Sequence, residues 1–407
     1  MKILQLCKKF PYPPKDGESI AILNIAHAMH KLGCEMHLLA MNTTKHYVED
    51  TRAIENLGIY SQIYTVDVDN RLKIKDAAIH LLSGDSYHIA RFRSEKFGLK
   101  LKELVNQFDY DVVQMETIYL SHYVDIVKTN SNALVALRAH NIEHEIWDRI
   151  TQNTRFLPKR WYIHKLTQQL KNYEVDHLNK YDFIAAISNK DLLNIKSLGY
   201  KNGAIFTPVG VDVAGLKITR SREDQSPFKI GFIGSLDWTP NHQGIRWFIR
   251  EVWPSLKEKF SDVELHIAGR NTPKSLLQQN VDRLFVHGEV NDAQEFVQSC
   301  HAMVVPLFSG SGMRVKIIES MTLGCPTVTT SVGLEGINAK HRKHIAIANT
   351  KEEFVKELSE LIQSPVHRKR MASNAHKFIL ENYDNLRLVG ELIHKYDMHL
   401  KLMQDQV

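Results

Sequence analysis

The chain has 407 residues, of which 43% are hydrophobic, so it is long enough for two domains of ordinary size, each with its own core. Its formal net charge of +6 is small and scattered, which argues against a nucleic-acid-binding protein. The four cysteines lie in apolar surroundings at no metal-ligand spacing, which predicts buried, reduced thiols in a cytoplasmic protein.

The first half of the sequence alternates strand and helix patterns, as a parallel sheet requires. Its opening, MKILQLCKKF, has too short an apolar stretch for a signal peptide, and no window reaches the length of a membrane span. Any membrane contact is therefore expected to be peripheral. The patterns predict strands at 2–7, 35–40, 111–114, 133–138 and 183–188, and helices at 20–32 and from residue 190.

A polar stretch at 217–227 interrupts this alternation and predicts a linker between two domains, 1–216 and 217–384. The pattern restarts with a strand from residue 228, strands at 264–268 and 283–287, and helices at 244–260 and from residue 291. Trp238 and Trp247 are expected in the core of this second domain. A last amphipathic helix is predicted at 385–403, and its apolar face needs a surface to pack against.

Residues 304–336 predict an anion-binding site on a strand, a glycine loop and a helix. The segment 304–308 is a short apolar strand, and the loop 309–312 leads to a helix expected to begin near Met313. The N–H groups of Ser311, Gly312 and Met313 would have no helical partner, and the helix dipole is positive there, so a phosphate is favoured.

Two cations follow in the first turn of this expected helix. Arg314 and Lys316 oppose the dipole at that position, so they favour a bound anion more than they favour the helix. Glu319, about two turns from the loop, is a candidate to accept hydrogen bonds from a ribose. An ordinary βα turn with solvated cations explains the same residues and remains open as an alternative.

A second two-domain class, the nicotinamide-dependent dehydrogenases, is disfavoured by the first βα turn. Such an enzyme needs Gly-x-Gly-x-x-Gly directly after its first strand. This chain has KKFPYPPKDGES there, a long proline-rich loop whose single glycine is Gly17.

The segment LRAHNIEHEIWDR, 137–149, places a cluster of polar groups at the end of a predicted strand, where α/β enzymes bind ligands. His140 is the candidate functional residue, and simple capping of the following helix is the alternative. A metal site is disfavoured because the histidines and acids lack a fixed pairing. The triplets Asp67-Val68-Asp69 and Asp109-Tyr110-Asp111 are interpreted as turns and not as metal ligands.

On these motifs the chain resembles the family 4 retaining glycosyltransferases, which have the GT-B fold of two Rossmann-like α/β domains facing a central cleft. The family pattern is a glutamate, seven residues, a second glutamate, and then Gly-x-Pro-Val-Val. The second glutamate matches Glu319 and residues 324–328 match the end of the pattern, but the first glutamate position falls on Ser311. In this respect the chain is similar to a branch with a glycine-rich loop followed by Arg-x-Lys.

The resemblance implies roles for further residues. The first loop of the family contacts the donor, which assigns Gly17, although Glu18 replaces a second glycine. The Arg-x-His-Asn-x-Glu pattern of the branch places His140 at the donor sugar. GSLDWTPN at 234–241 matches the branch pattern and assigns Gly234, with Ser235 where the wider family has an arginine. The ends of the next two strands assign Arg270 and Val290 to the donor site.

The resemblance also implies the reaction. We expect a hexosyltransferase that is retaining and metal-independent, uses a nucleoside diphosphate sugar as co-substrate without a further cofactor, and acts on a glycan or lipid-linked acceptor in polysaccharide synthesis. In the family the terminal helix, 385–407 here, packs back on the N-terminal domain. The alternatives are a GT-B nucleotide-sugar epimerase and a non-catalytic GT-B module. The expected location is the cytoplasm, with the inner face of the membrane as an option.

Overall fold

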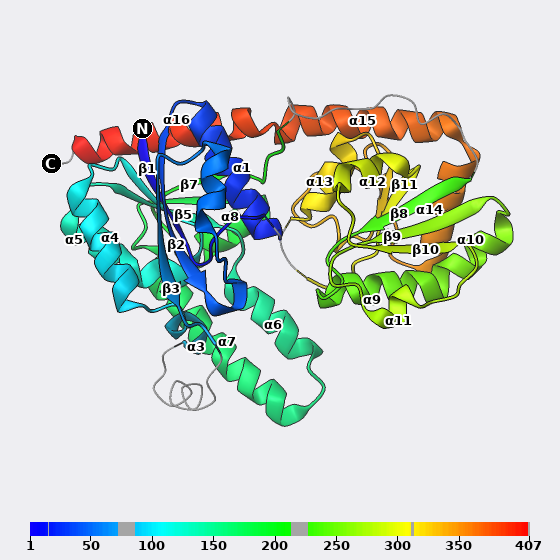
Figure 1. Ribbon diagram of the computed structural model, residues 1–407, viewed down its shortest axis with the longest axis horizontal. Coiled ribbons are helices and arrows are strands. Elements are labelled where there is room, and N and C mark those ends of the chain that lie inside the picture. The colour runs from blue at the N-terminus through cyan, green and yellow to red at the C-terminus, as the bar shows by residue number, and fades with distance from the viewer. Residues whose placement is uncertain (15, 72–85, 213–226, 311–312, 406–407) are drawn as a thin grey trace. The chain divides into compact units, whose positions relative to one another are not determined.

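The computed structural model describes residues 1–14, 16–71, 86–212, 227–310 and 313–405. They form two compact units, coloured by chain order in Figure 1. Unit 1 contains Met1–Gly210 and Asn385–Val407, and unit 2 contains Val211–Asp384. The predicted domain boundary at 216/217 lies outside the described residues.

Unit 1 is built on a seven-stranded parallel sheet with the order β3-β2-β1-β4-β5-β6-β7. Its strands are β1 (Lys2–Cys7), β2 (Glu35–Thr43), β3 (Gln62–Val68), β4 (Val112–Met115), β5 (Leu134–Ala139), β6 (Phe183–Ala186) and β7 (Gly203–Phe206). The five strands predicted in this unit are confirmed. The two that were not predicted, β3 and β7, form the edges of the sheet, where half-exposed side chains weaken the apolar pattern.

Alternation along β1 supplies both cores of unit 1. Leu4 and Leu6 face one core, and Ile3 and Cys7 face the other, because successive side chains of a strand point to opposite faces. The second core is covered by α1 (Gly17–Lys31) and α16 (Asn385–Gln404), which pack against each other (Figure 1). The apolar face of the terminal helix is therefore buried on unit 1.

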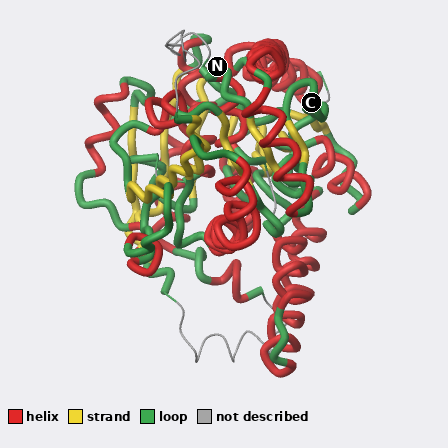
Figure 2. Tube along the Cα trace, turned by 90° about the vertical axis from the view of Figure 1, so that its right-hand side faces the viewer, coloured by secondary structure: helices red, strands yellow, loops and turns green. Residues whose placement is uncertain are grey.

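The other helical elements of unit 1 differ mainly in length. They are η1 (Thr44–His46), η2 (Thr51–Leu57), α3 (Tyr87–Ala90), α4 (Glu95–Gln107), η3 (Ile118–Tyr123), α5 (Val124–Asn130), α6 (Glu143–Asn153), α7 (Leu157–Leu178) and α8 (Asn189–Ser197). The helices α6 and α7 form a hairpin that projects from the rest of the unit (Figures 1 and 2).

Unit 2 has a six-stranded parallel sheet with the order β10-β9-β8-β11-β12-β13. Its strands are β8 (Phe228–Ile233), β9 (Val263–Ala268), β10 (Leu284–Gly288), β11 (Ala302–Val305), β12 (Thr327–Thr329) and β13 (Ala346–Ile347). Its helices are α9 (Thr239–Trp247), the π-helical turn η4 (Phe248–Val252), α10 (Trp253–Lys259), α11 (Lys274–Leu277), α12 (Ala293–Ser299), α13 (Val315–Thr322), α14 (Lys351–Gln363) and α15 (Pro365–Tyr383).

Two predictions about the helices of unit 2 need correction. The helix expected at 244–260 begins earlier, at Thr239, because Pro240 at its first turn is compatible with a helix start. The helix expected near Met313 begins at Val315, with Arg314 as its N-cap residue. The helix stop is confirmed, since Gly324 has a left-handed φ of 63°.

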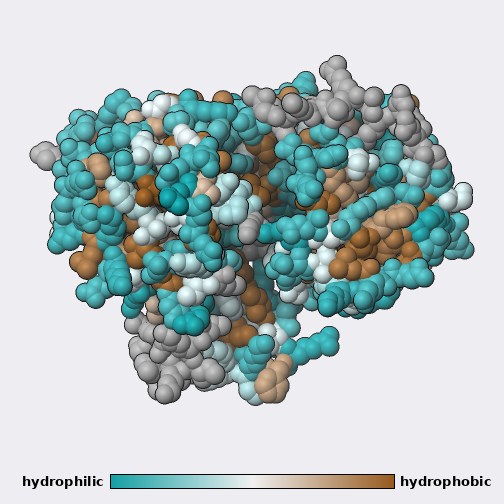
Figure 3. Space-filling view, in the orientation of Figure 1, coloured by the Kyte–Doolittle hydropathy of each residue, from teal (hydrophilic) through white to brown (hydrophobic). Residues whose placement is uncertain are grey.

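All four cysteines are buried thiols, as predicted. Among the described residues no helix is both long and apolar enough to cross a membrane. Apolar residues do gather on the surface over the β10 edge of unit 2 (Figure 3), where Leu277 and Phe285 are exposed.

Candidate active site

The strand order of each unit creates one crevice at the carboxyl ends of its strands. In unit 1 the order reverses between β1 and β4, and in unit 2 it reverses between β8 and β11. Chain segments leave the two central strands in opposite directions at such a switch point, and open α/β sheets bind ligands there. The predicted site residues fall around both crevices, and each crevice is described separately.

Lys316 lies at the switch point of unit 2. It projects from the first turn of α13 to the end of β8, where its Nζ donates to Asn241 Oδ1 at 2.6 Å and to the Ile233 carbonyl at 3.3 Å. Burial and, to a smaller extent, nearby Arg314 lower the pKa of Lys316 to about 7, although Glu319 acts in the opposite direction. The ammonium group is therefore poised to gain stability from an added negative charge.

Gly234 makes room for this lysine, because a Cβ there would lie 2.9 Å from Lys316 Nζ and 2.7 Å from Asn241 Nδ2. A Cβ on Gly269 would lie 1.9 Å from the Gly234 carbonyl oxygen, so the loop after β9 can approach Gly234 this closely only with a glycine at 269. The structure thus gives Gly234 a steric role, and its predicted contact with a donor stays a prediction.

Arg314 reaches the same crevice from the N-cap of α13. It is 7% exposed, and its guanidinium carbon lies 5.2 Å from the ring centroid of Trp238. The prediction that Trp238 is a core residue is wrong: it is 38% exposed, because α9 starts directly after it and leaves it on the loop. Trp247 does pack against the core, where its ring centroid lies 5.5 Å from that of Phe354.

The remaining predicted residues of unit 2 divide into three groups. Ser311 and Gly312 lie outside the described residues, and Met313 beside them is buried. Glu319 lies on α13 near Lys316, and burial raises its pKa while Lys316 lowers it. Arg270 follows β9, which is the neighbour of β8 in the sheet, and Val290 follows β10, which is one strand further from the switch point.

In unit 1 the loop after β1 and the first turn of α1 form a charge cluster that includes Glu18. Lys8 Nζ lies 3.2 Å and Lys9 Nζ 3.0 Å from the Glu18 carboxylate. Burial alone would raise the pKa of Glu18, but the two lysines lower it to about 2. Gly17 opens α1, is exposed, and has no atom within 4 Å of an added Cβ, so no steric requirement holds a glycine there.

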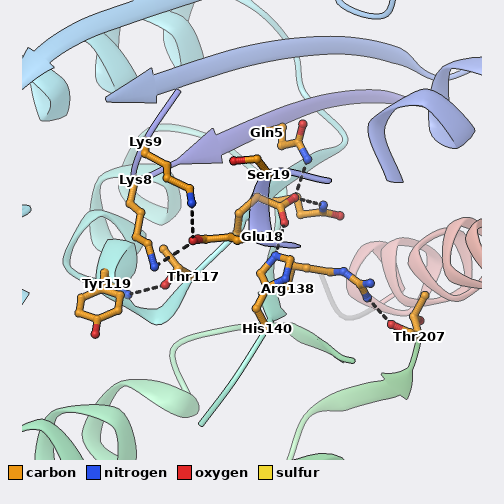
Figure 4. A network of polar contacts seen from close by, with 12 residues as sticks. Gln5, Lys8, Lys9, Glu18, Ser19, Thr117, Tyr119, Arg138, His140 and Thr207 are labelled. Carbon is orange, nitrogen blue, oxygen red and sulfur yellow. Dashed lines mark hydrogen bonds and ion pairs between the residues drawn. The ribbon is translucent and has the colours of Figure 1, made fainter. Parts of the chain in front are cut away.

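His140 is held by a carboxylate that the sequence analysis missed (Figure 4). Glu116 directly follows β4 and is fully buried. Its Oε2 lies 2.9 Å from His140 Nε2, and its Oε1 accepts hydrogen bonds from Gln5 Nε2 at 2.6 Å and Gln114 Nε2 at 2.5 Å. When Nε2 of His140 donates to Glu116, Nδ1 is the basic nitrogen of the ring.

Two tyrosines fix the amides that hold Glu116. The Tyr60 hydroxyl donates to Gln5 Oε1 at 2.7 Å, and the Tyr396 hydroxyl donates to Gln114 Oε1 at 3.0 Å. Each amide can therefore present only its NH₂ group to Glu116. Gln5 and Gln114 are register partners on the neighbouring strands β1 and β4, so the sheet itself brings the two donors together.

Several other polar groups of the segment 137–149 have structural partners. Arg138 donates to the Thr207 carbonyl at 2.7 Å, and burial lowers its pKa although Glu116 raises it. The Glu174 carboxylate accepts from the backbone N–H groups of Glu143 and His144, and so caps α6. The alternative in which His140 caps the following helix does not hold, because Glu174 is the residue that caps α6. The predicted functional role of His140 stays a prediction.

A cavity of about 30 Å³ adjoins His140 and has room for about one water molecule. Its polar lining includes Lys8, Glu18, Thr117 and Glu143. Burial raises the pKa of Glu143, and Lys8 lowers it. The cavity therefore brings together cationic and acidic groups beside the predicted catalytic histidine.

Residues of both Asp-x-Asp triplets have hydrogen-bond partners within unit 1. Asp69 accepts from Arg71 Nε at 2.9 Å, and Asp111 accepts from the Lys2 backbone N–H at 2.7 Å. Asp67 is part of β3, so its interpretation as a turn residue is wrong. In the part of the chain that the structure describes, no group of three or more His, Cys, Asp or Glu residues is placed to hold a metal ion.

Comparison with known proteins supports the fold and the class of activity. Residues 227–364 match the family model described as "Glycosyl transferases group 1". The chain is 23% identical over 404 residues to a protein of Klebsiella pneumoniae named "Uncharacterized 44.6 kDa protein in cps region", a match that covers 96% of this chain and 98% of that one. The predicted glycosyltransferase is thus confirmed at the level of the unit 2 domain.

Solved structures resemble the whole chain at low identity. Sucrose-phosphate synthase from Thermosynechococcus elongatus superposes with a TM-score of 0.69 at 12% identity, over 98% of this chain and 99% of that one. Anabaena HepE in complex with UDP-glucose gives 0.67 at 14%, over 98% and 100%. An S. aureus TarM variant in complex with UDP, fondaparinux and α-GlcNAc-glycerol gives 0.68 at 13%, over 97% and 100%. The predicted GT-B fold of two Rossmann-like α/β domains is confirmed.

Proposed function

We propose that this chain is a retaining glycosyltransferase that moves a sugar from a nucleoside diphosphate sugar to an acceptor hydroxyl in polysaccharide or glycoconjugate synthesis. The observation that carries the proposal is the cationic switch point of unit 2, where Lys316 and Arg314 are held beside the end of β8. The relative in the cps region supports the biological setting. The HepE and TarM complexes favour UDP as the nucleotide to test first.

In the proposed reaction the bond between the anomeric carbon and the diphosphate breaks, the acceptor hydroxyl attacks the same face of the sugar, and its proton passes to the departing diphosphate. Developing negative charge on the diphosphate is stabilised by Arg314, Lys316 and the N-terminus of α13. Glu319 accepts hydrogen bonds from the ribose. His140 of unit 1 orients the sugar, an assignment that rests on the resemblance of residues 138–143 to the branch motif.

A donor screen followed by product analysis tests the proposal. Binding to the folded state should stabilise the protein by about 2.7 kcal/mol at a ligand concentration of about a hundred times Kd, so thermal shifts with UDP-, GDP- and ADP-sugars should identify the donor. Mass analysis should then find the sugar on an acceptor and free nucleoside diphosphate. Conversion of the sugar without an acceptor would instead indicate an epimerase, and binding without turnover a non-catalytic module.

We further propose that transfer needs no divalent metal, because two cations already stand where Mg²⁺ would neutralise the diphosphate. Initial rates in saturating EDTA should equal those in untreated enzyme. Activity that disappears in EDTA and returns with Mg²⁺ or Mn²⁺ would contradict this, and Asp67 and Asp69 would then be the first residues to mutate.

Donor affinity should fall as the pH rises above about 7. Lys316 has a lowered pKa of about 7, so above that pH it is neutral in the ligand-free protein. A bound diphosphate restores the positive charge, so binding takes up a proton and affinity drops by up to about tenfold per pH unit. Calorimetry with the identified nucleotide sugar, whose diphosphate does not titrate in this range, measures both the slope and the proton uptake.

Lys316→Arg is the matched control for the pH dependence. Arginine stays protonated throughout the range, so its donor affinity should be nearly independent of pH. A slope that persists unchanged in Lys316→Arg would show that another group is responsible.

A further inference from the structure

The α6–α7 hairpin has a firmly held base. Glu174 on α7 caps α6 through the backbone N–H groups of Glu143 and His144. Further along, the buried Thr151 and Thr167 hydroxyls lie 3.5 Å apart across the two helices. These contacts hold the two helices of the hairpin together where it projects from unit 1 (Figures 1 and 2).

The tip of the hairpin, residues 155–161, is exposed along its whole length. It carries three large apolar side chains, with Phe156 67% exposed, Leu157 72% and Trp161 63%. Leu157 and Trp161 are four residues apart on α7 and therefore share one face, with Phe156 at its start. Figure 3 shows apolar and hydrophilic residues side by side at this lower end of the molecule.

The charge around this apolar tip has one sign. From residue 149 to residue 173 the sequence contains six cations and no acid. The formal charge of this segment is therefore +6, the same as that of the entire chain. The cations are Arg149, Arg155, Lys159, Arg160, Lys165 and Lys171. Within the described residues, Arg155, Lys159 and Arg160 form no ion pair. By contrast, Lys100 on α4 pairs with Glu103 at 2.7 Å.

We propose that the hairpin tip docks the protein on an anionic phospholipid surface. Aromatic rings and leucine insert at the boundary between headgroups and acyl chains, and the adjacent lysines and arginines bind the anionic headgroups. Three exposed apolar side chains with Arg155, Lys159 and Arg160 beside them in the sequence, and no acid, complement such a surface. A protein partner would have to supply an acidic and apolar groove of the same shape.

Vesicle flotation with the full-length chain tests this. The wild type should bind vesicles of phosphatidylcholine with phosphatidylglycerol more tightly than vesicles of phosphatidylcholine alone, and salt should weaken the binding. The triple variant Phe156→Ser/Leu157→Ser/Trp161→Ser should lower the partition coefficient by about tenfold or more. Lys159→Glu/Arg160→Glu should lower binding to the anionic vesicles by a similar factor.

Leu99→Ser/Leu193→Ser is the matched control, because these leucines of unit 1 are also 61% and 67% exposed but lie away from the tip. It should bind like the wild type, and all variants should keep the wild-type circular dichroism and melting temperature. Absent binding by a folded wild type, or equal loss in the control, overturns the proposal. So does lipid-free self-association that the triple variant abolishes, because the tip would then be an interface between copies.

Discussion

Arg314→Ala should lower kcat by about a hundredfold or more, the usual loss when one group that stabilises a developing charge is removed. The guanidinium is almost fully buried and is oriented by Trp238, with its charged carbon 5.2 Å from the ring centroid. This orientation exists before any ligand binds, so little reorganisation is needed when negative charge develops on the diphosphate. The measurement is kcat with the donor identified by thermal shift and a saturating acceptor.

Controls separate charge from packing in this experiment. Arg314→Lys keeps the charge but loses the planar group over Trp238, so its rate should lie between those of the wild type and Arg314→Ala. Arg246→Ala removes an exposed arginine from α9 in the same unit and should leave kcat unchanged. Wild-type turnover in a folded Arg314→Ala protein would remove Arg314 from the proposed mechanism.

The unit 2 site could be predicted because its parts are close together in the sequence. The site extends over residues 304–319, from the strand end and the glycine loop to Arg314, Lys316 and Glu319, so one local sequence pattern contains all of its parts. What the sequence did not contain is the partner of Lys316. Its contacts with Ile233 and Asn241 join α13 to β8 and α9, which lie 83 and 75 residues away in the sequence.

The unit 1 network could not be predicted by the same means. Gln5 and Gln114 interrupt two apolar strands, and each alone is only a weak irregularity in the pattern. Their meaning comes from the pairing of β1 with β4, which places both amides on the carboxylate of Glu116. A polar residue inside each of two buried strands, followed by an acid at a strand end, was the signal available in the sequence.

The projecting hairpin was missed for a different reason. A helix that buries one continuous face shows a clear apolar period, but α7 is buried at Leu166 and Leu170 and exposed at Leu157 and Trp161. Buried apolar residues and exposed apolar residues occur in the same helix, so the sequence of α7 shows no single apolar face.

Glu116→Gln should lower kcat by about a hundredfold and destabilise the fold by about 1–3 kcal/mol. The change keeps the shape of the side chain but replaces one carboxylate oxygen with an NH₂ group. The remaining oxygen can keep the hydrogen bonds from Gln5 and Gln114, and the NH₂ group then donates to Nε2 of His140; the opposite orientation sets the NH₂ group against two donors. In either arrangement His140 loses the carboxylate that fixes which of its nitrogens carries the proton.

A double-variant cycle distinguishes this positioning role from simple loss of stability. If Glu116 acts through His140, then Glu116→Gln/His140→Ala should be no slower than His140→Ala alone, because the second change removes a group whose partner is already gone. Rates that multiply would show that Glu116 acts independently of His140. The cycle is measured well below the melting temperature of the least stable variant, so that every protein is folded and the loss of kcat reports the orientation of the imidazole.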